Sequence, residues 1–111
     1  MPQSIGVDIE KISRFSKKKF LKNKSFYNKI FTNNEIDYCL KKIDPYPHFT
    51  VRFCAKEATK KALNNKKIVL KEIEVIIKNN KPILNLPKSL SGVVTLSHTE
   101  DYAIAFVLLD T

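Results

Sequence analysis

Glycine is scarce in this chain of 111 residues, which contains only Gly6 and Gly92. Two isolated glycines cannot form a glycine-rich phosphate loop, and neither the G-x-x-x-x-G-K-[ST] nor the G-x-G-x-x-G pattern occurs. The G-x-S-x-G pattern of hydrolases is also absent, and no spacing of Cys and His fits a zinc site. Any phosphate bound by this protein would therefore be contacted by side chains and metal ions.

Cysteines and long apolar runs are also few. Cys39 and Cys54 are the two cysteines, each within an apolar or helical stretch, which is too few for a disulfide framework and favours a reducing compartment. No apolar run approaches the ~20 residues of a membrane-spanning helix. The first ten residues lack the apolar region of a signal peptide. These absences predict a cytoplasmic protein that has no membrane partner.

Acidic residues are missing from residues 11–34, although the chain as a whole contains eleven. The same stretch contains eight basic residues: Lys11, Arg14, Lys17, Lys18, Lys19, Lys22, Lys24 and Lys29. Together with a formal net charge of +9, this block favours an anionic partner, which could be a nucleic acid, lipid head groups or an acidic protein. Charge alone does not choose among them, and a solvated lysine-rich surface is equally compatible.

The order of the predicted elements is typical of a single α+β domain that covers residues 1–111, with helices packed on a largely antiparallel sheet. We expect strands at 4–9, 71–78, 83–86, 93–97 and 103–109, helices at 11–31, 32–43 and 49–63, a break near 23–25, and a short helical turn at 87–91. Thr32 and Glu35 form a capping box at the start of the second helix, which Pro45 and Pro47 end. A domain of this size buries only about 60–70% of the surface of its unfolded chain, so self-association would cover more of it.

Three charged residues stand out as candidates for chemistry. Asp8 lies in the apolar run 5–9, where a carboxylate is costly unless it is exposed at the strand end, paired or bound to metal. Glu57 and Lys61 share one face of the predicted helix 49–63, an arrangement that by itself is usual for a solvated helix. Asp8 and Glu57 together match the one or two carboxylates that typically bind Mg²⁺, and Lys61 would offset phosphate charge.

A histidine lies where a predicted strand ends, in the segment Leu96-Ser97-His98-Thr99. A single histidine is more often a surface or capping residue than a functional one, but at a strand end it can hydrogen-bond a phosphate or a ligand ring. His98 is a better candidate than His48, which lies beside Pro47 in a predicted loop.

Read together, these segments resemble the holo-[acyl-carrier-protein] synthase family of 4′-phosphopantetheinyl transferases. The matching segments are Ile5-Gly6-Val7-Asp8-Ile9, Phe31-Thr32 with Glu35, Arg52-Phe53-Cys54-Ala55-Lys56-Glu57-Ala58 with Lys61-Ala62, and Leu96-Ser97-His98-Thr99 followed by Tyr102-Ala103-Ile104-Ala105. Their order and spacing agree over essentially the whole chain. One departure is Asn64-Asn65-Lys66-Lys67, which stands where relatives carry a glycine-containing turn.

The resemblance implies an enzyme that transfers 4′-phosphopantetheine from coenzyme A to a serine of an acyl carrier protein and releases 3′,5′-ADP. It implies the 4′-phosphopantetheinyl transferase fold and a homotrimer with active sites between subunits. Asp8 and Glu57 match the family's Mg²⁺ ligands, and Lys61 matches a lysine that contacts coenzyme A phosphate. These three residues form the expected catalytic group, in which either Glu57 or Asp8 could be the general base.

The resemblance also implies binding residues outside the catalytic group. His98 and Arg52 match positions that bind the nucleotide part of coenzyme A. Arg14, with the neighbouring Lys18 and Lys22, matches the surface that docks the acidic carrier protein. The positive charge then has a protein partner and requires no nucleic acid.

Two other readings of the sequence compete with this one. A small basic nucleic-acid-binding module would use the lysine-rich block, but it leaves Asp8 and Glu57 unexplained. A degenerate synthase kept for a structural role is disfavoured because Asp8, Glu57, Lys61 and His98 are all present. The range of acceptor carriers and the preference for Mg²⁺ or Mn²⁺ stay open.

Overall fold

The computed structural model describes residues 3–64, 68–87 and 89–110. The elements in chain order are β1 (Gln3–Lys11), α1 (Ser13–Ser16), η1 (Phe20–Lys22), α2 (Lys24–Ile30), α3 (Asn33–Leu40), α4 (Pro45–Leu63), η2 (Leu70–Glu72), β2 (Glu74–Lys78), β3 (Lys81–Asn85), β4 (Ser91–His98) and β5 (Tyr102–Asp110). None of the described helices combines the length and apolarity needed to cross a lipid bilayer.

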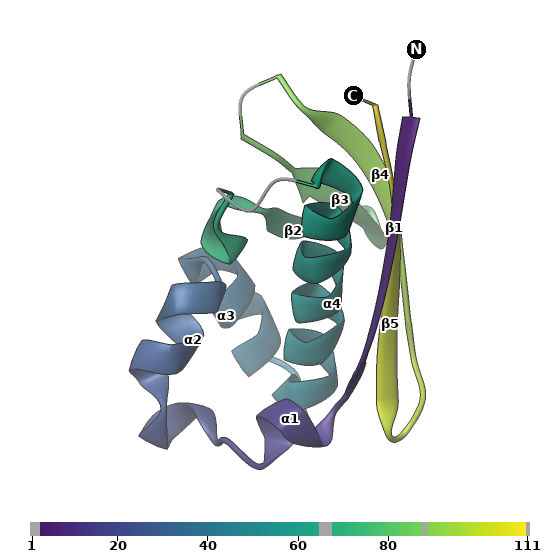
Figure 1. Cartoon of the computed structure of the whole chain (residues 1–111). Helices are drawn as coiled ribbons and strands as arrows, with labels where there is room; N and C mark the ends of the chain where they lie inside the picture. The colour runs from purple at the N-terminus through teal and green to yellow at the C-terminus, as the bar shows by residue number, and fades with distance from the viewer. Residues whose placement is uncertain (1–2, 65–67, 88, 111) are drawn as a thin grey trace.

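The described strands form a three-stranded antiparallel sheet in the order β1-β5-β4 and a separate antiparallel hairpin, β2-β3. The long helix α4 lies along one face of the larger sheet, α2 and α3 lie on the far side of α4, and α1 lies at the lower end of α4 (Figure 1). The opposite face of the sheet has no described element over it. The expected α+β class with an antiparallel sheet is therefore confirmed, with the strands divided between two sheets.

Side chains of β1 alternate between the two faces of the sheet, as a strand requires. Ser4, Gly6 and Asp8 face α4, whereas Ile5, Val7 and Ile9 point to the open face. Residues paired across the strands share a face, so Asp8, Ala105 and Leu96 form one row beneath α4. The strand register thus places the Asp8 carboxylate between the sheet and the helix.

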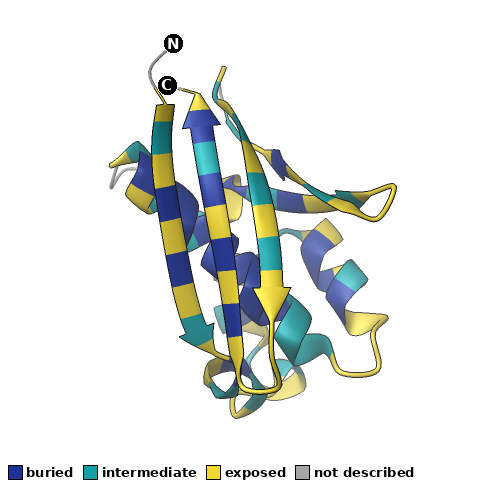
Figure 2. Cartoon of the chain, turned by 90° about the vertical axis from the view of Figure 1, so that its right-hand side faces the viewer, coloured by how far each residue is buried: buried dark blue, intermediate teal, exposed yellow. Residues whose placement is uncertain are grey.

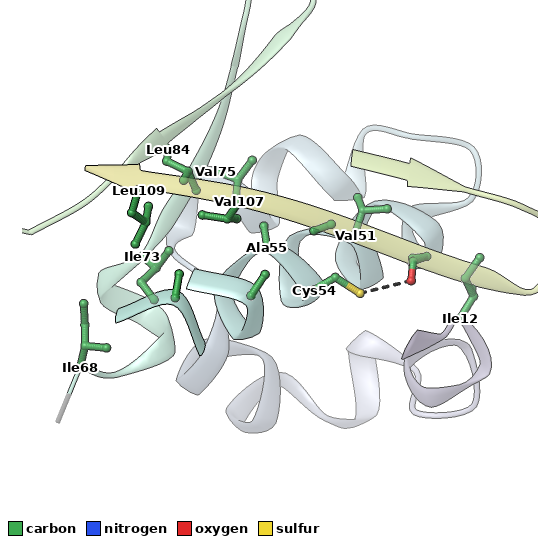
Figure 3. Packing of buried hydrophobic residues seen from close by; sticks show 14 residues of the cluster. Ile12, Val51, Cys54, Ala55, Ile68, Ile73, Val75, Leu84, Val107 and Leu109 are labelled. Atoms are coloured by element: carbon green, nitrogen blue, oxygen red, sulfur yellow. Dashed lines mark hydrogen bonds between the residues drawn. The ribbon is translucent and has the colours of Figure 1, made fainter. Parts of the chain in front are cut away.

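Helix α4 packs closely on the sheet because the residues between them are small. Ala55, which Figure 3 labels beneath β5, is buried together with Ala58 and Ala62 of the helix and with Ala103 and Ala105 of β5. At Gly6 the approach is so close that a Cβ atom would collide with the carbonyl oxygen of Ala58. Strand β1 and helix α4 are therefore held in nearly direct backbone contact.

A second core, on the other side of α4, is mainly aromatic and holds the shorter helices in place. Its buried aromatic residues are Phe15, Tyr27, Phe31, Phe49 and Phe53. The Tyr27 hydroxyl donates to the backbone oxygens of Phe15 and Lys18, and burial raises the pKa of Tyr27 well above its usual range.

A buried ion pair ties α3 to α4. The Glu35 and Lys56 side chains are fully buried, and Lys56 Nζ lies 2.7 Å from Glu35 Oε1. Glu35 also accepts hydrogen bonds from the backbone N–H groups of Thr32 and Val75, at 2.9 Å each. The predicted capping box is confirmed, because Thr32 Oγ1 accepts from Glu35 N–H in return. Glu35 thus joins α3, α4 and β2.

Three predicted boundaries near the N-terminus are wrong. The first strand continues to Lys11, and the region predicted as one or two helices to residue 31 is divided into α1, η1 and α2. The expected break near 23–25 is confirmed, because Asn23 separates η1 from α2. The helix expected to reach residue 43 ends at Leu40. Helix α1 buries Phe15 and α2 buries Tyr27, whereas η1 buries no residue.

The start of α4 is also different from the prediction. Pro45 is the first residue of the helix, where proline is tolerated because the missing N–H has no helical partner. The Asp44 side chain caps the helix by accepting from Tyr46 N–H at 3.1 Å. The segment 44–47 therefore begins a helix rather than only ending one, and His48 lies in α4 and not in a loop.

Two predictions concern segments that are only partly described. The predicted strand 71–78 begins at Glu74, since residues 70–72 form η2. The predicted helical turn 87–91 includes residue 88, which lies outside the described residues; residues 87, 89 and 90 form no helix. Asn64 ends α4 with a left-handed φ of 51°, as an asparagine in place of glycine can, and residues 65–67 lie outside the described residues.

Candidate functional site

Asp8 is held beneath α4 by one ion pair. Its Oδ1 lies 3.0 Å from Lys61 Nζ, which also donates to the backbone oxygen of Val7 at 3.1 Å. The second carboxylate oxygen, Oδ2, is buried and has no hydrogen-bond partner in the described part of the protein. A buried acceptor left unpaired costs about 1–3 kcal/mol, so an added ligand at Oδ2 would relieve this cost.

Glu57 lies one helical turn before Lys61 on α4 and is half-buried. Within residues 3–64, 68–87 and 89–110, no hydrogen bond or ion pair involves its carboxylate. Lys61 contacts Asp8 at the edge strand β1 and shares a helix face with Glu57, while no described ion pair joins Glu57 to either residue. We refer to Asp8, Glu57 and Lys61 as the carboxylate cluster.

The carboxylate cluster fits a hard divalent cation. Two carboxylates, one of which has an unpaired buried oxygen, provide the oxygen donors that Mg²⁺ prefers, and Mg²⁺ usually keeps several waters and substrate phosphates as its other ligands. Among the described residues there is no group of three or more His, Cys, Asp or Glu side chains that would enclose a metal completely. The donor set therefore suits a metal ion shared with a substrate.

Cys54 lies next to this cluster. Its thiol is buried and lies 3.4 Å from the backbone oxygen of Ala103. Burial raises the pKa of the Cys54 thiol to about 12, and the negative charges of Asp8 and Glu10 contribute. The thiol stays protonated at neutral pH and serves packing, as the sequence indicated.

Arg52 is a buried cation on a different side of α4. Only 2% of the residue is exposed, its Nη1 donates to the backbone oxygen of His48 at 3.0 Å, and its guanidinium lies 4.3 Å from the centre of the Tyr38 ring. Its Nε is buried without a partner, and no carboxylate of the described residues pairs with it. A buried charge without a counterion is unfavourable, which favours an anionic ligand here.

Arg52 lines a cavity of about 250 Å³ that also contains His98. We call it the arginine cavity, and its lining residues are Tyr38, His48, Val51, Arg52, Ile77, Pro82, Thr95, Leu96, Ser97 and His98. The His98 ring lies 6.2 Å from the His48 ring, and His98 Nδ1 is 3.2 Å from the Thr99 backbone oxygen. Cationic and imidazole groups beside apolar walls suit an anionic group attached to a flat ring.

The structure thus brings the predicted site residues together in two groups rather than one. Asp8 lies on β1 and His98 on β4, at opposite edges of the three-stranded sheet with β5 between them. The carboxylate cluster and the arginine cavity are therefore separated within one chain.

The predicted docking residues lie on the surface of the N-terminal helical region. Arg14 is half-exposed, pairs with Glu10 at 3.1 Å, and places its guanidinium 4.6 Å from the centre of the Phe53 ring. Lys18 lies over Phe26 and is exposed, as is Lys22. The neighbouring Leu21 is 80% exposed, so this surface combines positive charge with one apolar side chain.

His48 is the cavity residue that sequence reasoning missed. It precedes Arg52 by four residues, a spacing that places both on one face of a helix. This spacing is informative only if residue 48 is helical, and the helix begins at Pro45, before the predicted start at residue 49.

Comparisons with known proteins show what the chain is similar to. Residues 4–107 match the model of the 4'-phosphopantetheinyl transferase superfamily. The chain is 38% identical to the holo-[acyl-carrier-protein] synthase of Thermodesulfovibrio yellowstonii over 98% of this chain and 99% of that protein. It is 37% identical to the synthase of Chlamydia felis over 94% of this chain and 93% of that protein.

Solved structures of similar proteins include coenzyme A complexes. The synthase from Bacillus anthracis, in complex with CoA (3',5'-ADP), superposes with a TM-score of 0.85 at 29% identity and covers 97% of this chain and 96% of its own. The Helicobacter pylori synthase in complex with coenzyme A has a TM-score of 0.79 at 30% identity and covers 96% of this chain and 99% of its own.

Proposed function

Since the chain belongs to the holo-[acyl-carrier-protein] synthases of the 4′-phosphopantetheinyl transferase superfamily, we propose that it transfers 4′-phosphopantetheine from coenzyme A to a serine of an apo acyl carrier protein. The observation that carries the proposal is the buried Asp8 carboxylate, which has an unpaired oxygen and lies beside Lys61 with Glu57 on the same helix face. Two carboxylates and a lysine supply the metal ligands and the phosphate-binding cation that phosphoryl transfer uses.

Asp8 and Glu57 would hold the metal ion, for which we propose Mg²⁺. When bound, the ion neutralises charge on the pyrophosphate of coenzyme A and orients it. Lys61 exchanges its contact with Asp8 for one with a phosphate oxygen. Glu57 accepts the proton of the carrier serine hydroxyl. The serine oxygen then bonds to the β-phosphorus while the bond from that phosphorus to the bridging oxygen breaks, and 3′,5′-ADP leaves.

The arginine cavity would bind the nucleotide end of coenzyme A. Arg52 and His98 supply groups that interact with a phosphate, and the apolar residues of the cavity offer a surface for a ring. Binding of an anion would give the buried Arg52 guanidinium the counterion that it lacks. This proposal explains why a buried arginine is present without an acidic partner.

A mass measurement tests the proposed transfer. Apo acyl carrier protein incubated with this protein, coenzyme A and Mg²⁺ should gain the mass of one phosphopantetheine in intact-mass spectrometry, and EDTA should prevent the gain. The small-molecule product should be 3′,5′-ADP. If no gain occurs with several carriers although coenzyme A binds, the proposed activity is wrong.

We further propose that the protein is a homotrimer assembled through the open face of the larger sheet. Exposed apolar side chains from all three strands lie on this face. Figure 2 shows exposed positions alternating with buried ones along the strands. The exposed apolar residues of this face are Ile5, Val7, Ile9, Val93, Tyr102, Ile104 and Phe106. A set of exposed apolar side chains on one face is typical of an interaction surface, and the family resemblance supplies the number of subunits. Contact between subunits would also let β1 of one chain approach β4 of the next.

A charge on this face should separate the subunits. Phe106 lies on the central strand between Val7 and Thr95, so Phe106→Asp would bury a carboxylate in the interface. We expect light scattering to give about three times the chain mass of 12.8 kDa for the wild type and the single-chain mass for the variant. Asn28→Asp, an exposed change on α2, should stay trimeric. A wild type that is monomeric yet fully active would contradict the proposal.

Charge reversal on the N-terminal helical surface should weaken carrier docking alone. For Arg14→Glu combined with Lys18→Glu, we expect the KM for the carrier to rise about 10-fold or more, because opposite charges steer association, while coenzyme A affinity stays unchanged. Lys71→Glu combined with Lys78→Glu makes the same charge change at exposed positions elsewhere. Equal losses in the two double variants, or a parallel loss of coenzyme A binding, would argue against a docking surface.

A further inference from the structure

His48 occupies a position in the arginine cavity that gives it access to a ligand there. It lies in the first turns of α4, four residues before Arg52, and its backbone oxygen accepts from Arg52 Nη1. Its ring is 6.2 Å from the His98 ring and 6.3 Å from the Tyr38 ring, both in edge-to-face arrangements. Three elements, α3, α4 and β4, thus place an aromatic or imidazole ring at this cavity.

The charged groups around His48 are mostly cationic. Arg52 on the same helix, Lys42 after α3 and His98 on β4 face it, together with the Tyr38 hydroxyl from α3. Asp44, which caps α4, is the acidic group among them. Burial lowers the pKa of His48, as do Arg52, Lys42 and His98, while Asp44 opposes them. Without a ligand, His48 is therefore neutral at neutral pH and adds no further charge beside the buried arginine.

We infer that His48 is a third anion-binding residue of the arginine cavity, and that it takes up a proton from solvent when a phosphate of coenzyme A binds there. The inference rests on the proposed function, which assigns this cavity to the nucleotide end of coenzyme A. A phosphate placed among Arg52, His98 and His48 would add negative charge to a cluster that now has an excess of positive charge. Protonation of the His48 imidazole then becomes favourable, because the charged ring can donate a hydrogen bond to the phosphate.

Linkage fixes the direction of the pH effect. Because binding raises proton affinity at His48, protons and coenzyme A favour each other's binding to the same extent. Coenzyme A should bind more tightly at about pH 6 than at about pH 8, by up to roughly 10-fold for each pH unit crossed while one histidine titrates.

Isothermal titration calorimetry of the full chain with coenzyme A tests this inference. Titrations at about pH 6, 7 and 8, in buffers with different ionisation enthalpies, give both the affinity and the number of protons taken up. For the wild type we expect net uptake near neutral pH. His48→Gln, which stays neutral, should lose that uptake and most of the pH dependence of the affinity. His48→Arg, which carries a fixed charge, should retain at pH 8 much of the affinity that the wild type shows at lower pH.

Matched variants separate this inference from the proposed function. His98→Gln should weaken coenzyme A binding but retain proton uptake by His48. If His48→Gln binds coenzyme A with wild-type affinity and wild-type proton uptake, while Arg52→Gln and His98→Gln weaken binding, the role of His48 is wrong and the proposed cavity stands. If all three variants bind coenzyme A like the wild type, the nucleotide end lies elsewhere and both proposals fail.

A spectroscopic measurement on the unaltered protein covers the case in which a variant does not fold. Nuclear magnetic resonance titration of the His48 imidazole should show its pKa rising when coenzyme A is saturating. Inorganic phosphate at the same concentration should cause a much smaller change. An unchanged His48 pKa, or an equal change with phosphate alone, would overturn the inference.

Discussion

The substitutions Asp8→Asn and Glu57→Gln are each expected to lower the rate of carrier modification about 10³-fold, since metal-assisted stabilisation worth several kcal/mol would be lost. Both changes keep the size of the side chain and remove its charge. The rate should be followed by intact-mass spectrometry of the carrier at saturating coenzyme A and Mg²⁺. Neither variant should unfold, because Glu57 has no hydrogen-bond or ion-pair partner among the described residues and Asp8 has one.

The control for these substitutions is Asp37→Asn, which changes an exposed carboxylate on α3. It should leave the rate unchanged. Titration with Mn²⁺, monitored by paramagnetic resonance, should in addition show weaker metal binding in the two site variants only. Near-normal rates in both Asp8→Asn and Glu57→Gln would remove the basis of the metal assignment.

The largest expected effect on stability comes from Lys56→Met. This change leaves the buried Glu35 carboxylate without its cation, at an expected cost of about 3–5 kcal/mol of the free energy of unfolding. Lys56 Nζ also donates to the backbone oxygens of Leu70 and Ile73, so the same change leaves two acceptors with one donor fewer. Urea denaturation followed by circular dichroism measures the loss.

Lys29→Met, at an exposed position of α2, is the matched control for this experiment. Because surface substitutions are usually within about 0.5 kcal/mol of neutral, it should unfold almost as the wild type does. A Lys56→Met protein as stable as Lys29→Met would mean that Glu35 becomes protonated at little cost, and that the pair does not hold α3 against α4.

Local patterns in the sequence predicted those features that depend on neighbouring residues. The Thr32 and Glu35 capping box is one example, since both of its hydrogen bonds are local. The adjacency of Asp8 and Lys61, in contrast, joins residues 53 positions apart. It followed from the family resemblance, because no spacing rule links a strand residue to a distant helix.

The features that could not be predicted depend on tertiary packing. Ile5, Val7 and Ile9 look like core residues in the sequence, yet the strand register turns them to the open face of the sheet. Pro47 beside His48 predicts a loop, whereas the structure places both in the first turn of α4, where proline is tolerated. Apolar residues in a sequence indicate burial, and prolines indicate the end of an element. Neither signal predicts which other part of the protein will cover a residue.

The backbone contact at Gly6 also affects which amino-acid substitutions the protein can tolerate. Because no side chain lies between β1 and α4 at that point, the distance between the strand that carries Asp8 and the helix that carries Glu57 is fixed by main-chain atoms. Substitutions among the larger core side chains can then accumulate without moving the two carboxylates apart. The separation of strand and helix at this point therefore does not depend on the size of the other core side chains. The requirement is that position 6 remains glycine, since a Cβ atom there would collide with the Ala58 carbonyl oxygen.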